Sequence, residues 1–246
     1  MRTSRSTACS FRLNRGRATS SSRTICANPS RPFPNRRSNM SQWGFYHNAD
    51  ACVGCKACVI ACKDKNDLAL GRKLRRVYDY AGGSWKVDEQ GACRQEGSFV
   101  YSISVACMHC ASPLCVANCP SGAMTKREDG IVYVDTDLCI ACGTCAKSCP
   151  YGQPFVDEDR AHSVKCDFCR LLVDQGEEPA CVAACVTRAL SFGELSELEA
   201  QHGSVHAVPP LPDDTGTNPS LVLTPSRLNP DGALPGKVIN PEEEVL

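Results

Sequence analysis

The sequence predicts an α+β protein made of short strands, short helices and a large proportion of loop. Residues 52–185 hold 17 of the 19 cysteines, about one in eight, which is far above ordinary globular usage. The apolar runs are only a few residues long, and the chain ends in a proline-rich segment. We therefore expect a fold that wraps around whatever the cysteines bind or bridge.

The two ends of the chain differ from its middle. Residues 1–39 contain nine Arg, no acidic residue and no apolar periodicity, so they cannot bury enough surface to offset the entropy of ordering. We expect them to be disordered or untranslated, with translation starting at Met40; an Arg-rich and Ser-rich transit peptide is the alternative. Residues 203–246 hold eight of the sixteen prolines and no cysteine. They suit an extended arm that docks on another surface, or a flexible tail, and residues 40–202 are the expected folded domain.

Charge and hydropathy exclude two kinds of partner. From Met40 onward the chain has 18 basic and 27 acidic residues, a net charge of minus nine that matches nucleic-acid phosphates poorly. No run of 18 consecutive apolar residues exists, so no membrane span is expected. A pair of arginines precedes Met40, but no apolar segment follows it, and an export signal of the chain's own is not expected.

The cysteines fall into four groups of four. Group one is Cys52, Cys55, Cys58 and Cys62; group two is Cys107, Cys110, Cys115 and Cys119; group three is Cys139, Cys142, Cys145 and Cys149; group four is Cys166, Cys169, Cys181 and Cys185. Residues 50–58 align with residues 137–145 at a constant offset of 87, with the acidic, aliphatic and small positions matched. A weaker similarity relates residues 119–124 to residues 185–190. The domain is therefore expected to contain an internal repeat.

Secondary structure is predicted locally. The β-branched and aromatic runs at residues 99–105 and 131–134 indicate short strands, the second entered through Asp129-Gly130. Residues 194–202 indicate a short helix that ends at Gly203. Helical turns are expected after the third cysteine of each group.

Three chemistries could explain the cysteine groups: disulfides, structural zinc and iron-sulfur clusters. Disulfide scaffolds spread their cysteines through a secreted chain, whereas these cysteines form local clusters. Zinc prefers two Cys-x-x-Cys pairs from separate turns, a pattern that group four alone could supply in part. Groups one and three place three thiolates in one seven-residue loop, as the corners of a cubane cluster require. The fourth cysteine of such a run ligates the other cluster in two-cluster ferredoxins, and a proline follows it, as Pro120 and Pro150 do here.

The sixteen grouped cysteines therefore predict four [4Fe-4S] clusters, with Cys9, Cys26 and Cys93 left as unligated thiols. No catalytic residue is expected, because none of the five histidines lies near a Ser-Asp or metal-spaced pattern. His109, inside group two, is interpreted as a packing or hydrogen-bonding residue. Lysines beside the groups, such as Lys165, either raise cluster potentials or are solvated surface charges.

Several stretches together resemble the iron-sulfur electron-transfer subunit of bacterial anaerobic dimethyl sulfoxide reductase. They are Met40-Ser-Gln-Trp-Gly-Phe-Tyr, Cys52-Val-Gly-Cys-Lys-Ala-Cys, Tyr78-Asp-Tyr-Ala-Gly-Gly-Ser-Trp, Cys119-Pro-Ser-Gly-Ala-Met-Thr-Lys-Arg-Glu-Asp-Gly and Cys149-Pro-Tyr-Gly. The resemblance covers residues 40–210 in order and begins at Met40. Val186 departs from it, because the family usually has proline there, and only a local change of backbone is expected.

The resemblance implies a four-cluster protein with two ferredoxin-like modules, one from groups one and four and one from groups two and three. It implies crossed ligation by four sets of thiolates: Cys52, Cys55, Cys58 and Cys185; Cys62, Cys166, Cys169 and Cys181; Cys107, Cys110, Cys115 and Cys149; Cys119, Cys139, Cys142 and Cys145. It also implies that the group-three cluster lies closest to the membrane anchor.

The same resemblance implies two partners, a molybdopterin catalytic subunit that reduces dimethyl sulfoxide or a related S-oxide or N-oxide, and an integral-membrane anchor that oxidises quinol. The subunit would be peripheral on the cytoplasmic membrane and exported with its catalytic partner. The same role in a polysulfide, thiosulfate, tetrathionate or selenate reductase or a formate dehydrogenase, and a zinc-binding interaction module, are the alternatives. The terminal substrate is decided in another polypeptide.

A shorter chain that starts at Met40 is expected to assemble as well as the full chain, because residues 1–39 have no core-forming pattern. Co-purification of the two chains with their partner subunits compares them. Peptides from residues 1–39 in the mature native protein, together with failed assembly of the shorter chain, would contradict this expectation.

Overall fold

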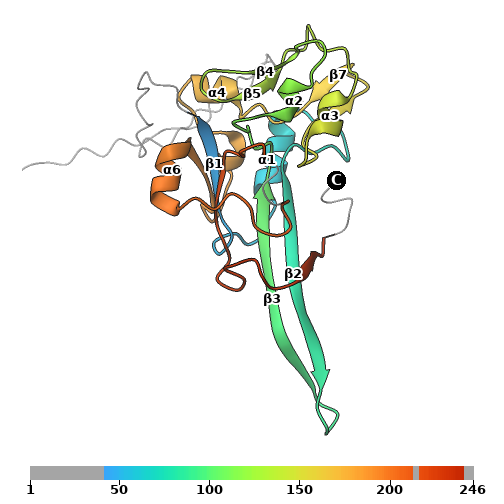
Figure 1. Cartoon of the computed structure of the whole chain (residues 1–246), viewed down its shortest axis with the longest axis vertical. Helices are drawn as coiled ribbons and strands as arrows, with labels where there is room; N and C mark the ends of the chain where they lie inside the picture. Colours follow the sequence, from blue (N-terminus) through green and yellow to red (C-terminus); the bar gives the residue numbers. More distant parts are fainter. Residues whose placement is uncertain (1–41, 213–215, 241–246) are drawn as a thin grey trace, which may run out of the picture. The chain divides into compact units, whose positions relative to one another are not determined.

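The computed structural model describes residues 42–212 and 216–240. The helices there are α1 (Ala57–Lys65), α2 (Leu114–Ala117), α3 (Thr144–Ser148), α4 (Arg170–Asp174), α5 (Ala180–Ala183) and α6 (Leu195–His202). The strands are β1 (Trp43–Asn48), β2 (Arg76–Val87), β3 (Cys93–Val105), β4 (Met124–Lys126), β5 (Val132–Val134), β6 (Phe155–Asp157), β7 (His162–Val164), β8 (Leu190–Glu194), β9 (Leu221–Thr224) and β10 (Gly236–Val238). Short elements joined by long loops agree with the predicted mixed fold class (Figure 1).

A three-stranded sheet in the order β8-β1-β9 forms one side of the main core. The strand β1 runs antiparallel to β8 and parallel to β9, so that Phe45 lies opposite both Phe192 and Leu221. The ring of Phe45 stacks on Phe168, with ring centroids 4.2 Å apart, and Phe168 has no exposed surface. The aromatic and β-branched residues of β1 and β9 therefore join segments from both ends of the domain around one aromatic cluster.

The longest elements, β2 and β3, form an antiparallel hairpin with β10 on its outer edge (Figure 1). Its base is buried, with Ile103 fully covered, whereas Trp85 near the turn keeps 69% of its surface exposed. The Asp88 carboxylate closes the turn by accepting hydrogen bonds from the backbone N–H groups of Gln90 and Ala92. Only the base of the hairpin can therefore contribute to the core.

A β-bulge interrupts the hairpin between Gly82 and Ser84. Gly83 has a φ of 111°, a conformation that residues with a side chain rarely adopt, and a Cβ there would lie 2.6 Å from the Cα of Ser98. Gly82 and Gly83 thus serve the geometry of the hairpin.

Two small hairpins, β4-β5 and β6-β7, accompany the cysteine loops. The first carries Met124 and Val132, which form a second small core with the thiols of Cys115 and Cys145. Cysteine side chains thus make up part of both cores.

The locally predicted elements are confirmed with adjusted bounds. The strand predicted at 99–105 lies within β3, the one predicted at 131–134 contains β5, and α6 ends at His202 with Gly203 as its C-cap, where φ is 88°. Helical turns include the third cysteine of every group, in α1, α2, α3 and α5. The strands β1, β2 and β8 were not predicted, because their residues mix apolar, polar and glycine positions without a clear period of two. The strand β9 was not predicted because it lies in the segment that was expected to be an arm or a tail.

The C-terminal segment differs from the expectation of a separate tail. In β9 Leu221, Val222 and Leu223 are at most 3% exposed, and β10 pairs with β2. At least these parts of residues 203–246 therefore belong to the chain's own sheets. The prolines lie outside β9 and β10, where a missing backbone N–H does not interrupt the pairing.

Replacing Ile103 by Ala is expected to lower the free energy of unfolding of the protein, prepared with its clusters bound, by about 2–5 kcal/mol, because it removes a fully buried side chain from the hairpin base. Val100→Ala, on the same strand but 54% exposed, is the matched control and should change stability by about 0.5 kcal/mol or less. Anaerobic denaturant titration followed by tryptophan fluorescence measures both. Equal effects of the two substitutions would contradict the assigned core.

Candidate cofactor sites

The backbone has the same conformation at one position of all four cysteine groups. The residue before the second cysteine always has a positive φ, 65° at Gly54, 44° at His109, 54° at Ala141 and 61° at Phe168. Such a left-handed residue turns successive N–H groups toward one side and forms a concave site for an anion. Because this conformation costs roughly 1–3 kcal/mol for a residue other than glycine, its recurrence indicates a functional constraint on the loops.

A second recurring feature follows the fourth cysteine in groups two, three and four. The N–H of the residue three positions on donates a hydrogen bond to the cysteine carbonyl, and that residue also has a positive φ: Gly122 to Cys119 at 3.3 Å, Gly152 to Cys149 at 3.2 Å and Arg188 to Cys185 at 3.3 Å. Val186 therefore leaves this turn in place, although proline occupies the equivalent position in the other two groups.

The structure gathers the sixteen grouped cysteines into four sets of four. We name them quartet A (Cys52, Cys55, Cys58 and Cys185), quartet B (Cys62, Cys166, Cys169 and Cys181), quartet C (Cys107, Cys110, Cys115 and Cys149) and quartet D (Cys119, Cys139, Cys142 and Cys145).

Electrostatic coupling places the members of quartets A and B near one another. Burial, together with the charges of the other three thiols of quartet A, raises the pKa of Cys52 to about 11. In quartet B burial raises the pKa of Cys166 well above its usual value, and Cys62, Cys169 and Cys181 are among the thiols that add to the shift. Both quartets draw members from opposite ends of the domain.

Quartets C and D each line a cavity. Cys107, Cys110, Cys115 and Cys149 line the first, together with Pro150 and Tyr151 among others. All four thiols of quartet D line the second, beside Gly143 and Ser163. Four soft thiolates around one cavity, beside a loop residue of left-handed conformation, fit the donor set of a cubane iron-sulfur cluster.

Paired helices explain how each cysteine group serves two quartets. The helix α1 packs on α5, and α2 packs on α3, as Figure 1 also shows for α2 and α3. On α1, Cys58 belongs to quartet A and Cys62 to quartet B. Because they are four positions apart on a helix, they are separated by about 6 Å along its axis. The same exchange relates quartets C and D through Cys115 and Cys119.

The quartets follow one another in the order A, B, C, D. Cys181 of quartet B influences the pKa of Cys58 in quartet A, and Cys107 of quartet C influences that of Cys166 in quartet B. Cys115 and Cys145 join quartets C and D in one apolar cluster. The two end quartets each contain an exposed thiol, Cys55 and Cys142.

The thiols differ in how readily they ionise. Burial, first among several causes, raises the pKa of Cys62 and of Cys115 to about 12. Slight burial of Cys119 opposes ionisation, but hydrogen bonds led by the Met124 N–H lower its pKa. The pKa of Cys142 is also lowered, by the hydroxyl and N–H of Thr144. Cys119 and Cys142, both of quartet D, therefore form thiolates more readily than Cys62 and Cys115 do.

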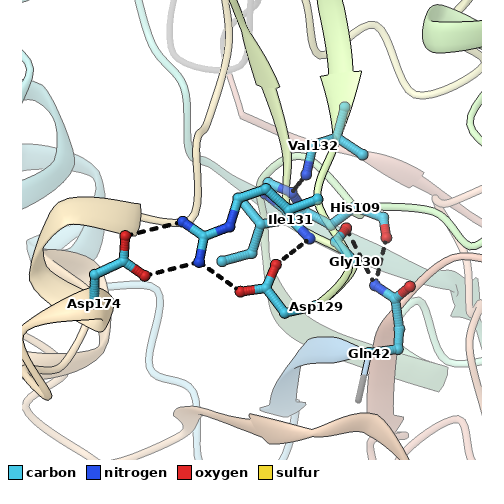
Figure 2. A network of polar contacts seen from close by, with 8 residues as sticks. Gln42, His109, Asp129, Gly130, Ile131, Val132 and Asp174 are labelled. Carbon is cyan, nitrogen blue, oxygen red and sulfur yellow. Dashed lines mark hydrogen bonds and ion pairs between the residues drawn. The ribbon is translucent and has the colours of Figure 1, made fainter. Parts of the chain in front are cut away.

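A polar network holds the group-two loop in place (Figure 2). The Gln42 amide donates to the carbonyl oxygens of His109 at 3.0 Å and Gly130 at 3.4 Å, and the Val132 N–H donates to Nδ1 of His109 at 3.0 Å. Arg127 lies in the loop between β4 and β5 and donates to both carboxylate oxygens of Asp174 on α4, at 2.8 and 2.9 Å. The network thus connects the segment of quartets C and D to the segment of quartet B.

The structure also places the histidine, the lysine and the ungrouped cysteine that the sequence analysis singled out. His109 is 1% exposed, and its ring meets Phe168 edge-on at 5.1 Å between ring centroids, as expected for a packing and hydrogen-bonding residue. Lys165 is buried, and its ammonium group donates to the carbonyl oxygens of Val132 and Cys166. Cys93 is exposed on β3, outside the quartets, whereas Cys9 and Cys26 lie outside the described residues.

Sequence reasoning missed three residues beside the quartets. Ser104 Oγ lies 3.2 Å from Cys58 Sγ, and Ser163 Oγ lies 3.2 Å from Cys145 Sγ. Arg75 is buried near quartets A and B. No local signal marks these residues, because tertiary folding brings them to the thiols.

Single-ion metal sites and membrane-spanning helices are both absent from the described ranges. Within residues 42–212 and 216–240, no three His, Cys, Asp or Glu side chains form a group that could hold a single metal ion. In the same ranges no helix has the length and apolar character that crossing a bilayer requires.

Comparison with known proteins places the chain among iron-sulfur subunits. The 4Fe-4S dicluster domain family matches residues 98–195. One of the chains of the anaerobic dimethyl sulfoxide reductase of Escherichia coli K12 is 45% identical over 82% of this protein and 98% of its own length. Its namesake in Haemophilus influenzae is 42% identical over 83% of this protein and all of its own length. One of the chains of the polysulfide reductase of Wolinella succinogenes is 35% identical over 76% of this protein and 95% of its own length.

Reconstitution of the cluster-free chain with ferrous iron and sulfide is expected to accelerate between pH 7 and pH 9. Ligands must bind as thiolates, and for Cys62 and Cys115, with pKa values of about 12, the thiolate fraction rises about tenfold per pH unit in this range. Cys119 and Cys142 of quartet D should become protected from alkylation first, because they ionise more readily. Timed alkylation and mass spectrometry follow each cysteine. A rate that does not change with pH, or earliest protection of quartet B, would contradict the assigned thiol environments.

Proposed function

This protein belongs to the family of iron-sulfur subunits of anaerobic dimethyl sulfoxide reductase, and from this premise we propose that it relays electrons through four [4Fe-4S] clusters without catalysing a reaction itself. The gathering of sixteen cysteines into four sets of four is the observation that carries the proposal. When bound, each cluster would accept and release one electron at a time.

The proposed ligands of each cluster are the four thiolates of one quartet. Quartets A and B then form one two-cluster module and quartets C and D the other, each with the third and fourth cysteine of a run in different clusters. The left-handed residues before the second cysteines support this assignment, because this conformation brings successive N–H groups to one side of a loop, as an anionic cluster requires.

The order of the quartets supports a relay with two ends. Exposed thiols at Cys55 and Cys142 give quartets A and D the most direct access to partner surfaces, whereas Cys62 and Cys166 in quartet B are buried. A chain whose only task is to pass electrons needs no nucleophile or general base, and the buried histidines are held as neutral packing residues. Burial lowers the pKa of His47 to about 4 and that of His109 well below its usual value.

The proposed partners are a molybdopterin catalytic subunit and an integral-membrane anchor that oxidises quinol. Similarity to two proteins named for dimethyl sulfoxide reductase favours an S-oxide or N-oxide as terminal substrate. The polysulfide reductase relative supports the alternative of a sulfur-compound reductase. We propose that the chain is peripheral on the membrane through these partners and is exported together with the catalytic subunit.

Anaerobically prepared full-length protein is expected to contain about sixteen iron and sixteen acid-labile sulfide per chain, four of each per cluster. Elemental analysis and sulfide assay measure these contents, with zinc measured in the same sample. Stoichiometric zinc without labile sulfide would contradict the proposal in favour of a zinc-binding module.

Replacing Cys142 by Ser is expected to convert the cluster of quartet D to a [3Fe-4S] centre while the other three clusters remain. The loss of one iron and one thiolate changes cluster type and net charge, two determinants of potentials that span about −700 to +450 mV. Because about 59 mV is a tenfold change in a one-electron equilibrium, a shift of a few hundred millivolts would trap electrons at this centre. Quinol-driven turnover of the complex should fall, whereas a dye that feeds the catalytic subunit should still support it.

Cys93→Ser is the matched control, since Cys93 is an exposed cysteine outside the quartets. This substitution should leave the paramagnetic resonances of the clusters, the quinol-driven turnover and the dye-driven turnover unchanged. Unchanged quinol-driven turnover in the Cys142 variant despite a [3Fe-4S] signal, or loss of all four clusters together, would contradict the assigned position of quartet D.

A further inference from the structure

Arg75 is one of the largest fully buried side chains among the described residues, with 1% of its surface exposed. It directly precedes β2, and its guanidinium lies over the ring of Phe45, 4.7 Å from the centroid. Burying a charged group in an apolar core is unfavourable unless an opposite charge compensates it. Arg75 therefore requires a negative charge close by.

The protein supplies only part of the bonding that this guanidinium needs. Nη1 donates to the carbonyl oxygen of Ser104 at 3.3 Å and to its hydroxyl at 3.2 Å. Nε and Nη2 are buried and have no hydrogen-bond partner. Within residues 42–212 and 216–240, no Asp or Glu forms an ion pair with Arg75.

The negative charges that act most strongly on Arg75 are those of cysteine thiolates. Burial on its own would lower the pKa of Arg75, but thiolates from two quartets reverse the effect and raise it. They are Cys58 of quartet A and Cys62, Cys166 and Cys181 of quartet B. The Ser104 hydroxyl that accepts a hydrogen bond from Nη1 also lies 3.2 Å from Cys58 Sγ. Arg75 thus lies at the junction of the two quartets.

The other buried groups at this junction do not substitute for Arg75. Lys165 directs its ammonium group to the backbone carbonyl oxygens of Val132 and Cys166. His47 has its Nε2 3.1 Å from the carbonyl oxygen of Ser102, and burial keeps its ring neutral by lowering its pKa to about 4. Of Arg75 and Lys165, the cationic residues classed as buried in the described ranges, only Arg75 has side-chain nitrogens without a hydrogen-bond partner.

We propose that Arg75 is a redox-tuning residue whose free N–H groups bind sulfur atoms of the clusters in quartets A and B, and whose charge raises the reduction potential of both. This inference rests on the proposed four-cluster function. Hydrogen bonds to cluster sulfur and the net charge around a cluster are established determinants of its potential. An added electron is stabilised by a nearby cation, most strongly where water is excluded.

The test is a redox titration of the loaded, full-length protein, followed by electron paramagnetic resonance. Arg75→Gln keeps a similar shape but removes the charge and most donors, and it should lower two of the four midpoint potentials. We expect at least a tenfold change in each reduction equilibrium, which equals about 59 mV for a one-electron couple. Lys86→Gln, which removes an exposed cation paired with Glu96 on the hairpin, is the charge-matched control and should shift none.

A second measurement decides the inference even where the Gln variant fails to fold. Protein labelled with ¹⁵N-arginine should show hyperfine coupling of an arginine nitrogen to a reduced cluster, and Arg75→Lys should abolish that coupling. Four clusters without this coupling, or unchanged potentials in a folded Arg75→Gln protein, would overturn the role of Arg75 alone. Absence of four [4Fe-4S] clusters from the native protein would overturn the proposed function as well.

Discussion

Cys58 and Cys62 share one short helix but face different quartets, and the rest of the described fold depends on this exchange. A helical turn between them sets two centres side by side, and each centre must then be completed by thiols from another segment. For α1 that segment includes α5, and for α2 it is α3. The short helices, small hairpins and long loops satisfy this requirement, and the sheet β8-β1-β9 holds the ends of the domain together around it.

Gathering many thiolates in one interior has an electrostatic cost, and two features of the structure offset it. Burial raises the pKa values of Cys62 and Cys115 to about 12 and so favours neutral thiols at these positions, whereas bound metal requires thiolates. A left-handed residue precedes each second cysteine, as at Ala141 and Phe168, and this conformation brings successive N–H groups to one side of the loop, where they can stabilise an anion. Buried cations, Arg75 above all, provide compensating charge where two quartets meet.

Much of the site could be predicted from the sequence, because cysteine spacing is a local property. The grouping, the repeat at an offset of 87 and the helical turns around third cysteines all follow from short windows of residues. The sheet containing β1 could not be predicted, since its partners β8 and β9 lie far along the chain and β9 belongs to the segment expected to be a tail. Arg75 was missed for the same reason: only tertiary packing buries it, and a lone arginine before a strand carries no sequence signal.

Crossed ligation can be distinguished from ligation within each sequence group by anomalous diffraction at the iron absorption edge, measured on crystals of the anaerobically prepared protein. Crossed ligation predicts four separate iron-rich sites, each surrounded by the thiolates of one quartet, with Cys58 and Cys62 bound to different sites. Four cysteines of one sequence group converging on a single site, or single-ion sites in place of clusters, would contradict it.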